Sequence, residues 1–381
     1  MNKFPMKLWI ILADLRLLAR VTRFILRLRV ALLILAVVAT SLPVTSARAE
    51  TSSLADGLFR TYAVLGNPKH VAVEAPGRIW FTAPSIDAVG VLTVVEINDR
   101  IVEYRTRYFF TGAGSKPYDL VVHNGVVWFT LSGTSELGRL LIATEELTHY
   151  PLALNSVPHG LALRENDATL WYAAQGGNAL GRFDTATSLL TEFPYPKPNA
   201  GLEDIAFGAG NEVWVTATQG NEVRQFDAVA ETFQLAVPTG VGGAPISIAV
   251  DVFNFPWVTF AETGDISRYA PGTLALWRRF AAPLSAGQPA GIHIQGDSFS
   301  QRIWYTLSAA GAVGYFHTRN SGQLLTPHIN FRLPGLNSAP WGITVDADGA
   351  AWIADSGANQ LVEWLPPYFE PLYLPVIARQ E

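Results

Sequence analysis

The sequence predicts an all-β fold, a seven-bladed β-propeller of four-stranded blades closed by an N-terminal strand in the last blade. Three observations lead to this prediction. A segment of about 43 residues recurs seven times, each copy contains short runs of alternating apolar and polar residues, and the two ends of the repeat region complement each other. Alternation with a period of two is typical of β-strands, and four short strands per repeat are typical of a propeller blade.

Each repeat is marked by one tryptophan. The intervals between these tryptophans are 48, 43, 43, 43, 47 and 48 residues, and they are Trp80, Trp128, Trp171, Trp214, Trp257, Trp304 and Trp352. An apolar run that usually opens with proline precedes each one, as in Pro158-His159-Gly160-Leu161. A turn and two further short strands follow it. We expect the tryptophans to pack between neighbouring blades rather than to take part in chemistry.

The ends of the repeat region predict how the ring closes. After Trp352 the chain offers only one more strand, Gln360 to Leu365, before Pro366-Pro367. The segment Leu58–Tyr62 reads as a stray fourth strand that precedes the first full copy. Its pairing into the last blade would remove the open sheet edges. The propeller is therefore predicted over residues 50–365, and an apolar C-terminal tail of undetermined role is left at 366–381.

Residues 1–49 are predicted to be a signal peptide. Basic residues at helical spacing lead into an uninterrupted apolar run, Val30 to Ala39, and the small-residue pattern Ala47-Arg48-Ala49 follows. A basic region, a short apolar region and an A-x-A site are typical of secretory signals, and ten apolar residues are short for a membrane span. An uncleaved N-terminal anchor is the alternative. Either way the protein is expected to be exported, to the extracellular space or the cell envelope.

Composition excludes several classes of protein. The 381 residues contain no cysteine, which excludes disulfide scaffolds, thiolate metal sites and cysteine nucleophiles. Charged residues make up 15% and the net charge is −5, which disfavours disorder and binding to nucleic acid. Removing residues 1–49 takes away eight basic residues and one acidic residue, and leaves 19 basic against 31 acidic. We expect an acidic monomer that contacts a membrane only through an uncleaved N-terminal segment.

The repeat resembles that of a known family. Its pattern, Pro-x-Gly-Ile, then Trp-Phe-Thr, Asn-x-Ile-Gly-Arg and Thr-Glu-Phe, is similar to the streptogramin B lyase (virginiamycin B lyase) repeat over residues 58–365. The resemblance implies a seven-bladed propeller. It also implies Mg²⁺ and the opening of a cyclic depsipeptide antibiotic by elimination.

The residues that the resemblance would make catalytic are replaced. Family members carry Pro-His at the start of the sixth blade and Glu-Pro-His at the start of the seventh, with a further Glu just past that blade's Trp. This chain has Ala290 at the first position, and Ala339 and Trp341 at the second. Asp355 is at best a displaced substitute for the last Glu. No catalytic residue transfers cleanly, so whether the chain is an enzyme stays open.

A candidate site can still be read from the repeat. The residue after each leading proline begins the innermost strand, near the mouth of the central channel. Around the ring this position is Lys69, Tyr118, His159, Glu203, Ile246, Ala290 and Trp341. Polar residues fall on blades one to four and apolar ones on blades five to seven, which suits a concave ligand site. His159 and Glu203, on adjacent blades, are the candidates for an acid–base pair, with His70, Asp204 and Asp355 as nearby candidates.

Three hypotheses follow. In the first, the protein binds a small molecule or a partner protein at the mouth, through Lys69, Tyr118, His159, Glu203, Trp341 and Asp355, without the family's catalytic residues. In the second, it is a divalent-metal-dependent lyase or hydrolase centred near His159 and Glu203. In the third, it is a structural module of the cell surface.

Overall fold

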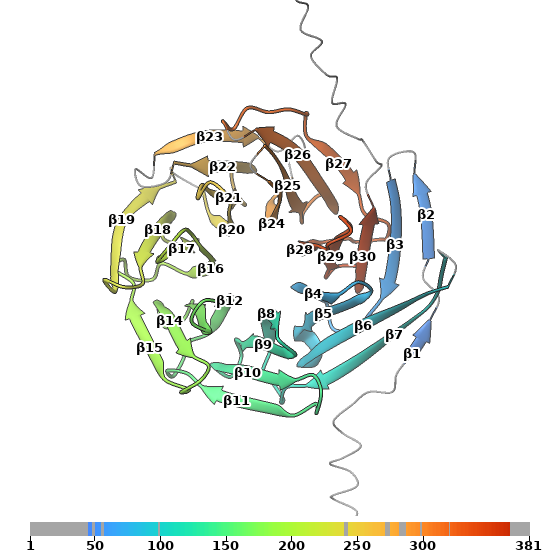
Figure 1. Ribbon diagram of the computed structural model, residues 1–381, viewed down its shortest axis with the longest axis horizontal. Helices are drawn as coiled ribbons and strands as arrows, with labels where there is room; N and C mark the ends of the chain where they lie inside the picture. Colours follow the sequence, from blue (N-terminus) through green and yellow to red (C-terminus); the bar gives the residue numbers. More distant parts are fainter. Residues whose placement is uncertain are drawn as a thin grey trace, which may run out of the picture. The chain divides into compact units, whose positions relative to one another are not determined.

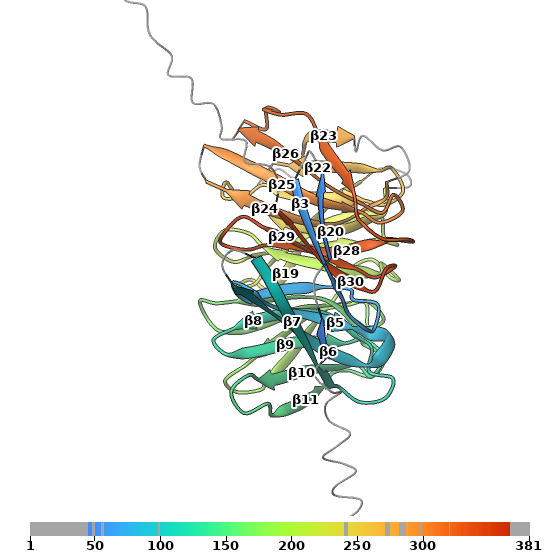
Figure 2. The same ribbon diagram turned by 90° about the vertical axis from the view of Figure 1, so that its right-hand side faces the viewer.

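The computed structural model describes residues 45–47, 50–54, 57–97, 100–239, 243–270, 275–281, 287–297, 299–319 and 321–365. In this part of the chain, strands form seven antiparallel sheets that surround a central axis as the blades of a propeller (Figures 1 and 2). The predicted fold class is confirmed. Most of the predicted leader and all of the predicted tail lie outside the described residues.

In blades 1 to 6 four strands follow one another in sequence order from the axis outwards, and blade 7 contributes three strands in the same order. Those of blades 1 to 3 are β4 (Val71–Ala75), β5 (Arg78–Ala83), β6 (Ala88–Ile97) and β7 (Arg100–Phe110); β8 (Pro117–His123), β9 (Val126–Leu131), β10 (Glu136–Leu141) and β11 (Leu147–Pro151); β12 (Pro158–Arg164), β13 (Thr169–Ala174), β14 (Ala179–Asp184) and β15 (Leu190–Pro194). A short 3₁₀ helix, η1 (Pro84–Ile86), follows β5.

The later blades repeat this order. Their strands are β16 (Leu202–Phe207), β17 (Glu212–Ala217), β18 (Glu222–Asp227) and β19 (Thr232–Pro238) in blade 4; β20 (Pro245–Val250), β21 (Pro256–Phe260), β22 (Asp265–Tyr269) and β23 (Leu276–Ala281) in blade 5; β24 (Pro289–Gly296), β25 (Ser300–Leu307), β26 (Ala312–Arg319) and β27 (Ile329–Arg332) in blade 6; β28 (Pro340–Val345), β29 (Ala351–Asp355) and β30 (Gln360–Leu365) in blade 7.

The N-terminal segment closes the ring. Strand β3 (Gly57–Ala63) pairs antiparallel with β30, from Leu58 opposite Leu365 to Ala63 opposite Gln360, and is the fourth strand of blade 7. The predicted closure is thereby confirmed. Two outer strands were not predicted: β1 (Thr45–Ala47) pairs with β7, and β2 (Glu50–Leu54) pairs with β3. The segment therefore lines the outer edges of both blades that meet at the closure (Figure 1).

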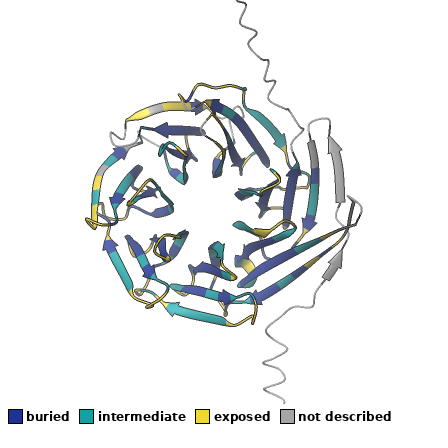
Figure 3. Ribbon diagram, in the orientation of Figure 1, coloured by how far each residue is buried: buried dark blue, intermediate teal, exposed yellow. Residues whose placement is uncertain are grey.

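The repeated tryptophans lie on the second strand of each blade and form the core between blades. All seven are buried (Figure 3). Trp128 packs against Leu161, Tyr172 and Phe183 of blade 3, and Trp214 packs against residues of blade 5. The predicted role of the tryptophans is confirmed. Burying an aromatic ring between neighbouring blades joins each sheet to the next through a hydrophobic cluster of its own.

A turn residue of each blade ties that blade to the next. The residue just before each third strand has a positive φ: Asp87, Ser135, Asn178, Asn221, Gly264, Gly311 and Asn359. Asparagine, aspartate and glycine tolerate this conformation best. The polar members also accept a backbone N–H from the loop that enters the following blade, as Asn178 does from Ala200 at 2.8 Å. A local turn preference therefore also sets how adjacent blades sit together.

Candidate functional site

The side chains at the start of each innermost strand differ in direction from the rest of the strand because the backbone there is irregular. In blades 2 to 7 the pairing register shifts between the first and fourth residues of this strand, as between Pro117 and Leu120. Such a bulge takes the residues in between out of the ladder and re-aims their side chains. We call the first of these residues in each blade, with Lys69 in blade 1, the mouth residues: Lys69, Tyr118, His159, Glu203, Ile246, Ala290 and Trp341.

Threonines of the repeat hold the mouth residues in place. The hydroxyl of Thr130 on β9 accepts the backbone N–H of Asp119 at 3.0 Å and donates to the carbonyl of His159 at 2.8 Å. Equivalent threonines donate to the carbonyls of four other mouth residues, namely Tyr118, Ile246, Ala290 and Trp341. In five of the seven blades a threonine hydroxyl thus links two neighbouring innermost strands; Ala173 and Ala354 take its place in blades 3 and 7.

Four mouth residues from consecutive blades form a stack that we call the stacked arc: Trp341, Lys69, Tyr118 and His159. The Lys69 ammonium nitrogen lies 3.5 Å from the centroid of the Trp341 ring and 4.4 Å from that of Tyr118. The His159 ring stacks on Tyr118 at 3.8 Å between centroids, with 11° between planes. Since His159 covers one face of Tyr118, the amine lies over the other. The repeat pattern groups Trp341 with the apolar mouth residues of blades 5 to 7. Closure of the propeller brings blade 7 next to blade 1, so Trp341 contacts Lys69.

The stacked arc ends on a carboxylate. Glu203 accepts hydrogen bonds from the Tyr118 hydroxyl and, at 3.1 Å, from the Gln175 amide, and its Oε2 lies 3.0 Å from Nδ1 of His159. A carboxylate oxygen only accepts, so Nδ1 carries the proton of this bond. In the neutral ring Nε2 is then the nitrogen without a proton, and no described residue bonds to it; the Gln175 amide nitrogen also lies 3.2 Å from Nδ1. The structure thus brings together the two residues proposed as an acid–base pair, and adds Gln175, which the repeat pattern did not single out.

The protonation states at this end are coupled. Burial by itself favours the neutral acid, but the hydrogen bonds that Glu203 accepts from His159 and Tyr118 outweigh it. They hold the pKa of Glu203 below its usual value, helped by the Lys69 charge. Burial, followed by the charge of Glu203, raises the pKa of Tyr118 well above its usual value. Tyr118 is therefore a neutral donor and Glu203 an ionised acceptor at neutral pH.

The acidic residues one step along the innermost strands have structural partners. Asp119 accepts the backbone N–H of Leu161 in the next blade at 2.8 Å, and it lies 3.1 Å from His70. Asp204 accepts the Ser247 hydroxyl at 2.7 Å and the Ile248 N–H at 3.0 Å. Burial and then the charge of Asp119 raise the pKa of Asp204 to about 6. These carboxylates tie blades together behind the mouth, beside His70, whose Nε2 is buried with no hydrogen-bond partner among the described residues.

Comparison with known proteins places this chain in a family. The virginiamycin B lyase family matches residues 58–364, which is most of the chain. The protein belongs to this family. No curated protein matches the sequence.

Solved structures of family members share the fold at low identity. A streptogramin B lyase is 21% identical, with a TM-score of 0.69, over 82% of this chain and 98% of that one. The virginiamycin B lyase of Staphylococcus aureus, in selenomethionine form, is 19% identical, with a TM-score of 0.68, over 80% and 98%. A catalytically inactive His-to-Ala form of the S. aureus enzyme with quinupristin is 19% identical, with a TM-score of 0.66, over 84% and 99%. At this identity the likeness shows the fold alone.

The residues at the positions that the resemblance would make catalytic offer little to a hard cation such as Mg²⁺. Ala290, Ala339 and Trp341 have no side-chain oxygen to offer. Asp355 is fully buried; its Oδ1 accepts the Ala339 N–H at 2.7 Å and its Oδ2 accepts the Gln360 amide at 2.9 Å. Hard divalent cations need several oxygen ligands. Among the described residues no group of three or more His, Asp or Glu could hold a metal, and no helix is long and apolar enough to span a membrane.

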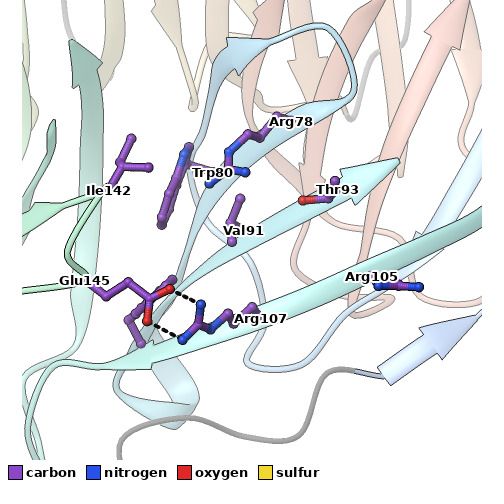
Figure 4. Close-up of a pocket in the computed structure, with 9 residues that line it drawn as sticks. Arg78, Trp80, Val91, Thr93, Arg105, Arg107, Ile142 and Glu145 are labelled. Atoms are coloured by element: carbon purple, nitrogen blue, oxygen red, sulfur yellow. Dashed lines mark hydrogen bonds and ion pairs between the residues drawn. The ribbon is translucent and has the colours of Figure 1, made fainter. Parts of the chain in front are cut away.

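A hollow of about 300 Å³ lies away from the mouth, between the outer strands of blade 1 and the β10–β11 turn of blade 2 (Figure 4). Trp80 and Phe109 line it together with arginines. The Arg107 guanidinium makes a two-pronged ion pair with Glu145, and Arg78 bonds to Glu74 at 2.6 Å. Two of the guanidinium groups are already paired with carboxylates, so they are not available to an anionic ligand. We therefore interpret the hollow as a gap in the packing of two blades and not as a binding site.

Proposed function

We propose that the protein binds a small molecule with an apolar body and a carbonyl or carboxylate oxygen at the mouth of the propeller, without the family's elimination chemistry. The observation that carries this proposal is the stacked arc. In it the half-buried Lys69 amine has no hydrogen-bond or ion-pair acceptor among the described residues. A positive donor between two aromatic faces suits an oxygen acceptor on an apolar ligand.

The opposite side of the mouth supports an apolar body. Ile246 is half-buried and Ala290 is buried, and neither carries a polar side-chain atom. The replacement of the family's histidine and glutamate positions by Ala290, Ala339 and Trp341 supports binding without ring opening. Opening a cyclic depsipeptide by elimination needs a general base beside the acidic α-proton of the substrate and a cation on its ester carbonyl.

A ring-opening assay tests the catalytic part of this proposal. The full chain is incubated with quinupristin and Mg²⁺, and the ligand is analysed by mass spectrometry and chromatography. We expect quinupristin to be recovered intact and the midpoint of thermal unfolding to rise in its presence, because a ligand that binds only the native state stabilises it. Recovery of the linear product with multiple turnovers would contradict the proposal.

The His159–Glu203 contact favours a second candidate, an enzyme that moves a proton at Nε2 of His159. The ionised Glu203 would orient the ring and stabilise its protonated form, as a carboxylate does for a histidine base. If a substrate is turned over, His159→Ala should abolish turnover while leaving the fold intact. Unchanged turnover in that variant would remove this candidate.

Export is proposed from the first 49 residues. Cleavage after Ala49 would remove β1 and retain β2 and β3, so the closing strand would stay in place. The N-terminus of the mature protein, read by mass spectrometry from a culture fractionated into medium, envelope and cytoplasm, tests the proposal. A chain that keeps residue 1 and stays in the cytoplasm would contradict it, and recovery solely from the medium would contradict a cell-surface module.

A further inference from the structure

Lys69 is one of few lysines in the chain, and its surroundings differ from those of the others. The chain has five lysines against 22 arginines, and only Lys69, Lys116 and Lys197 lie beyond the predicted leader. The exposed Lys116 lies on a loop, and Lys197 donates to the carbonyl of Gly220 at 2.5 Å. The amine of Lys69 instead faces two aromatic rings and has no acceptor among the described residues. Aromatic faces attract a cation but offer no hydrogen-bond donor to the lone pair of a neutral amine.

The surroundings also decide how much of the amine is neutral. Burial lowers the pKa of Lys69 to about 8, although the negative charges of Glu203 and Asp119 act in the opposite direction. At pH 7.5 roughly a quarter of such an amine is neutral, against about 0.1% for a lysine with an ordinary pKa. A neutral amine has a free lone pair, and desolvation of this kind is how proteins activate lysines as nucleophiles.

We propose that Lys69 is a nucleophile that forms an imine with an aldehyde-bearing ligand at the mouth. This inference rests on the proposed function, since it concerns the same site and names the reactive group of the ligand. The Lys69 nitrogen attacks the carbonyl carbon, a C–N bond forms, and the C–O π electrons move to oxygen. The nitrogen then loses its protons, the oxygen gains them and leaves as water, and a C=N bond remains. The net change is amine plus aldehyde to imine plus water, with no oxidant or reductant.

Neighbouring side chains suit this chemistry. The Trp341 and Tyr118 rings shield both sides of the amine, which keeps water from solvating its charged form. Beyond Tyr118, the stacked His159 carries a basic Nε2 in this tautomer, and Glu203 fixes the ring. We therefore expect aromatic or apolar aldehydes to react in preference to small hydrated ones, because the rings add contact area to the bound ligand.

Reductive trapping tests the inference. The full chain is incubated with benzaldehyde and sodium cyanoborohydride, which reduces an imine to a stable benzylamine, and peptide mapping by mass spectrometry then measures labelling at each lysine. We expect the initial rate at Lys69 to exceed that at the exposed Lys116 at pH 7.5 by about tenfold, and the Lys69 rate to reach half its maximum near pH 8. The rate should saturate with benzaldehyde concentration, as it does when binding precedes reaction.

Variants separate this inference from the proposed function. Lys69→Arg keeps a positive charge at the mouth but cannot form an imine, so benzaldehyde labelling should remain only at Lys116 and the other lysines, at their wild-type rates. Trp341→Ala should remove both the saturation and the preference for Lys69. Equal labelling rates at Lys69 and Lys116 in the wild type, with quinupristin still bound, would overturn the imine alone. Preferential but non-saturating labelling that Trp341→Ala leaves unchanged would overturn the binding site on which the inference rests.

Discussion

Asp251→Ala should lower the free energy of unfolding by about 3–5 kcal/mol, because it removes the carboxylate from a buried ion pair. The side chains of Asp251 and Arg268 are both fully buried, with Nη2 and Oδ2 2.6 Å apart. Asp251 also accepts the indole N–H of Trp257 at 2.9 Å, and the guanidinium lies 3.9 Å from the centroid of the Phe255 ring. One substitution therefore disturbs a turn, an ion pair and the core tryptophan of blade 5.

Thermal unfolding measures this effect, and an exposed pair provides the matched control. Asp251→Ala should lower the midpoint by about 5–8 °C, whereas Glu231→Ala, which breaks the exposed ion pair with Arg182 at 2.8 Å, should cost about 1 kcal/mol or less. The double variant Asp251→Ala with Arg268→Met should recover part of the loss, since it removes the buried guanidinium together with the carboxylate. Equal midpoints for Asp251→Ala and Glu231→Ala would contradict a large stabilising effect of the buried Asp251–Arg268 pair.

Removal of the closing strand should have a still larger effect. A chain that begins at residue 64 lacks β3, and with it Phe59 and Tyr62, both fully buried. Phe59 stacks on Trp364 at 5.5 Å between centroids, and the Tyr62 hydroxyl donates to Glu363 at 2.6 Å. Losing one buried aromatic side chain costs about 3–5 kcal/mol, and losing two with a paired strand exceeds the total stability of many domains.

A second truncation shows whether the strand itself is responsible. A chain that begins at Gly57 keeps β3 and loses β1 and β2, and we expect it to unfold cooperatively within a few degrees of the full chain. The chain from residue 64 should show no cooperative transition by circular dichroism and should be cut rapidly by protease. A cooperative transition at the wild-type temperature in the shorter chain would show that closure by β3 is not required.

The fold could be predicted because the same pattern occurs seven times. Each blade carries its own alternating strands, its tryptophan and its turn residue, so a strand that is hard to recognise in one copy can be assigned from the others. The closing strand was recognisable because Leu58–Tyr62 alternates like a fourth strand and the last copy lacks one. Strands β1 and β2 were not predicted. They lie outside the repeat, and Thr45–Ala47 falls within a segment whose composition indicates a leader.

The site could be predicted only as a set of positions. The repeat identified the mouth residues, and adjacent blades brought His159 and Glu203 together as a pair. Side-chain directions depend on packing that a repeat pattern does not contain. For this reason the sequence did not predict that Trp341 contacts Lys69 where blade 7 meets blade 1, or that Asp355 accepts hydrogen bonds within its own turn. Gln175 follows β13 rather than starting an innermost strand, so its approach to Glu203 had no sequence signal.

The most direct test of the account is calorimetric titration of the full chain with quinupristin, for the wild type, Trp341→Ala and Phe299→Ala. Phe299 is 74% exposed in blade 6, outside the mouth residues, and serves as the control for losing an aromatic ring. We predict that the wild type and Phe299→Ala bind with equal affinity, and that Trp341→Ala binds at least about tenfold more weakly, as expected for an aromatic anchor. No binding to the wild type, or equal affinity for Trp341→Ala, would contradict a ligand site built on the stacked arc.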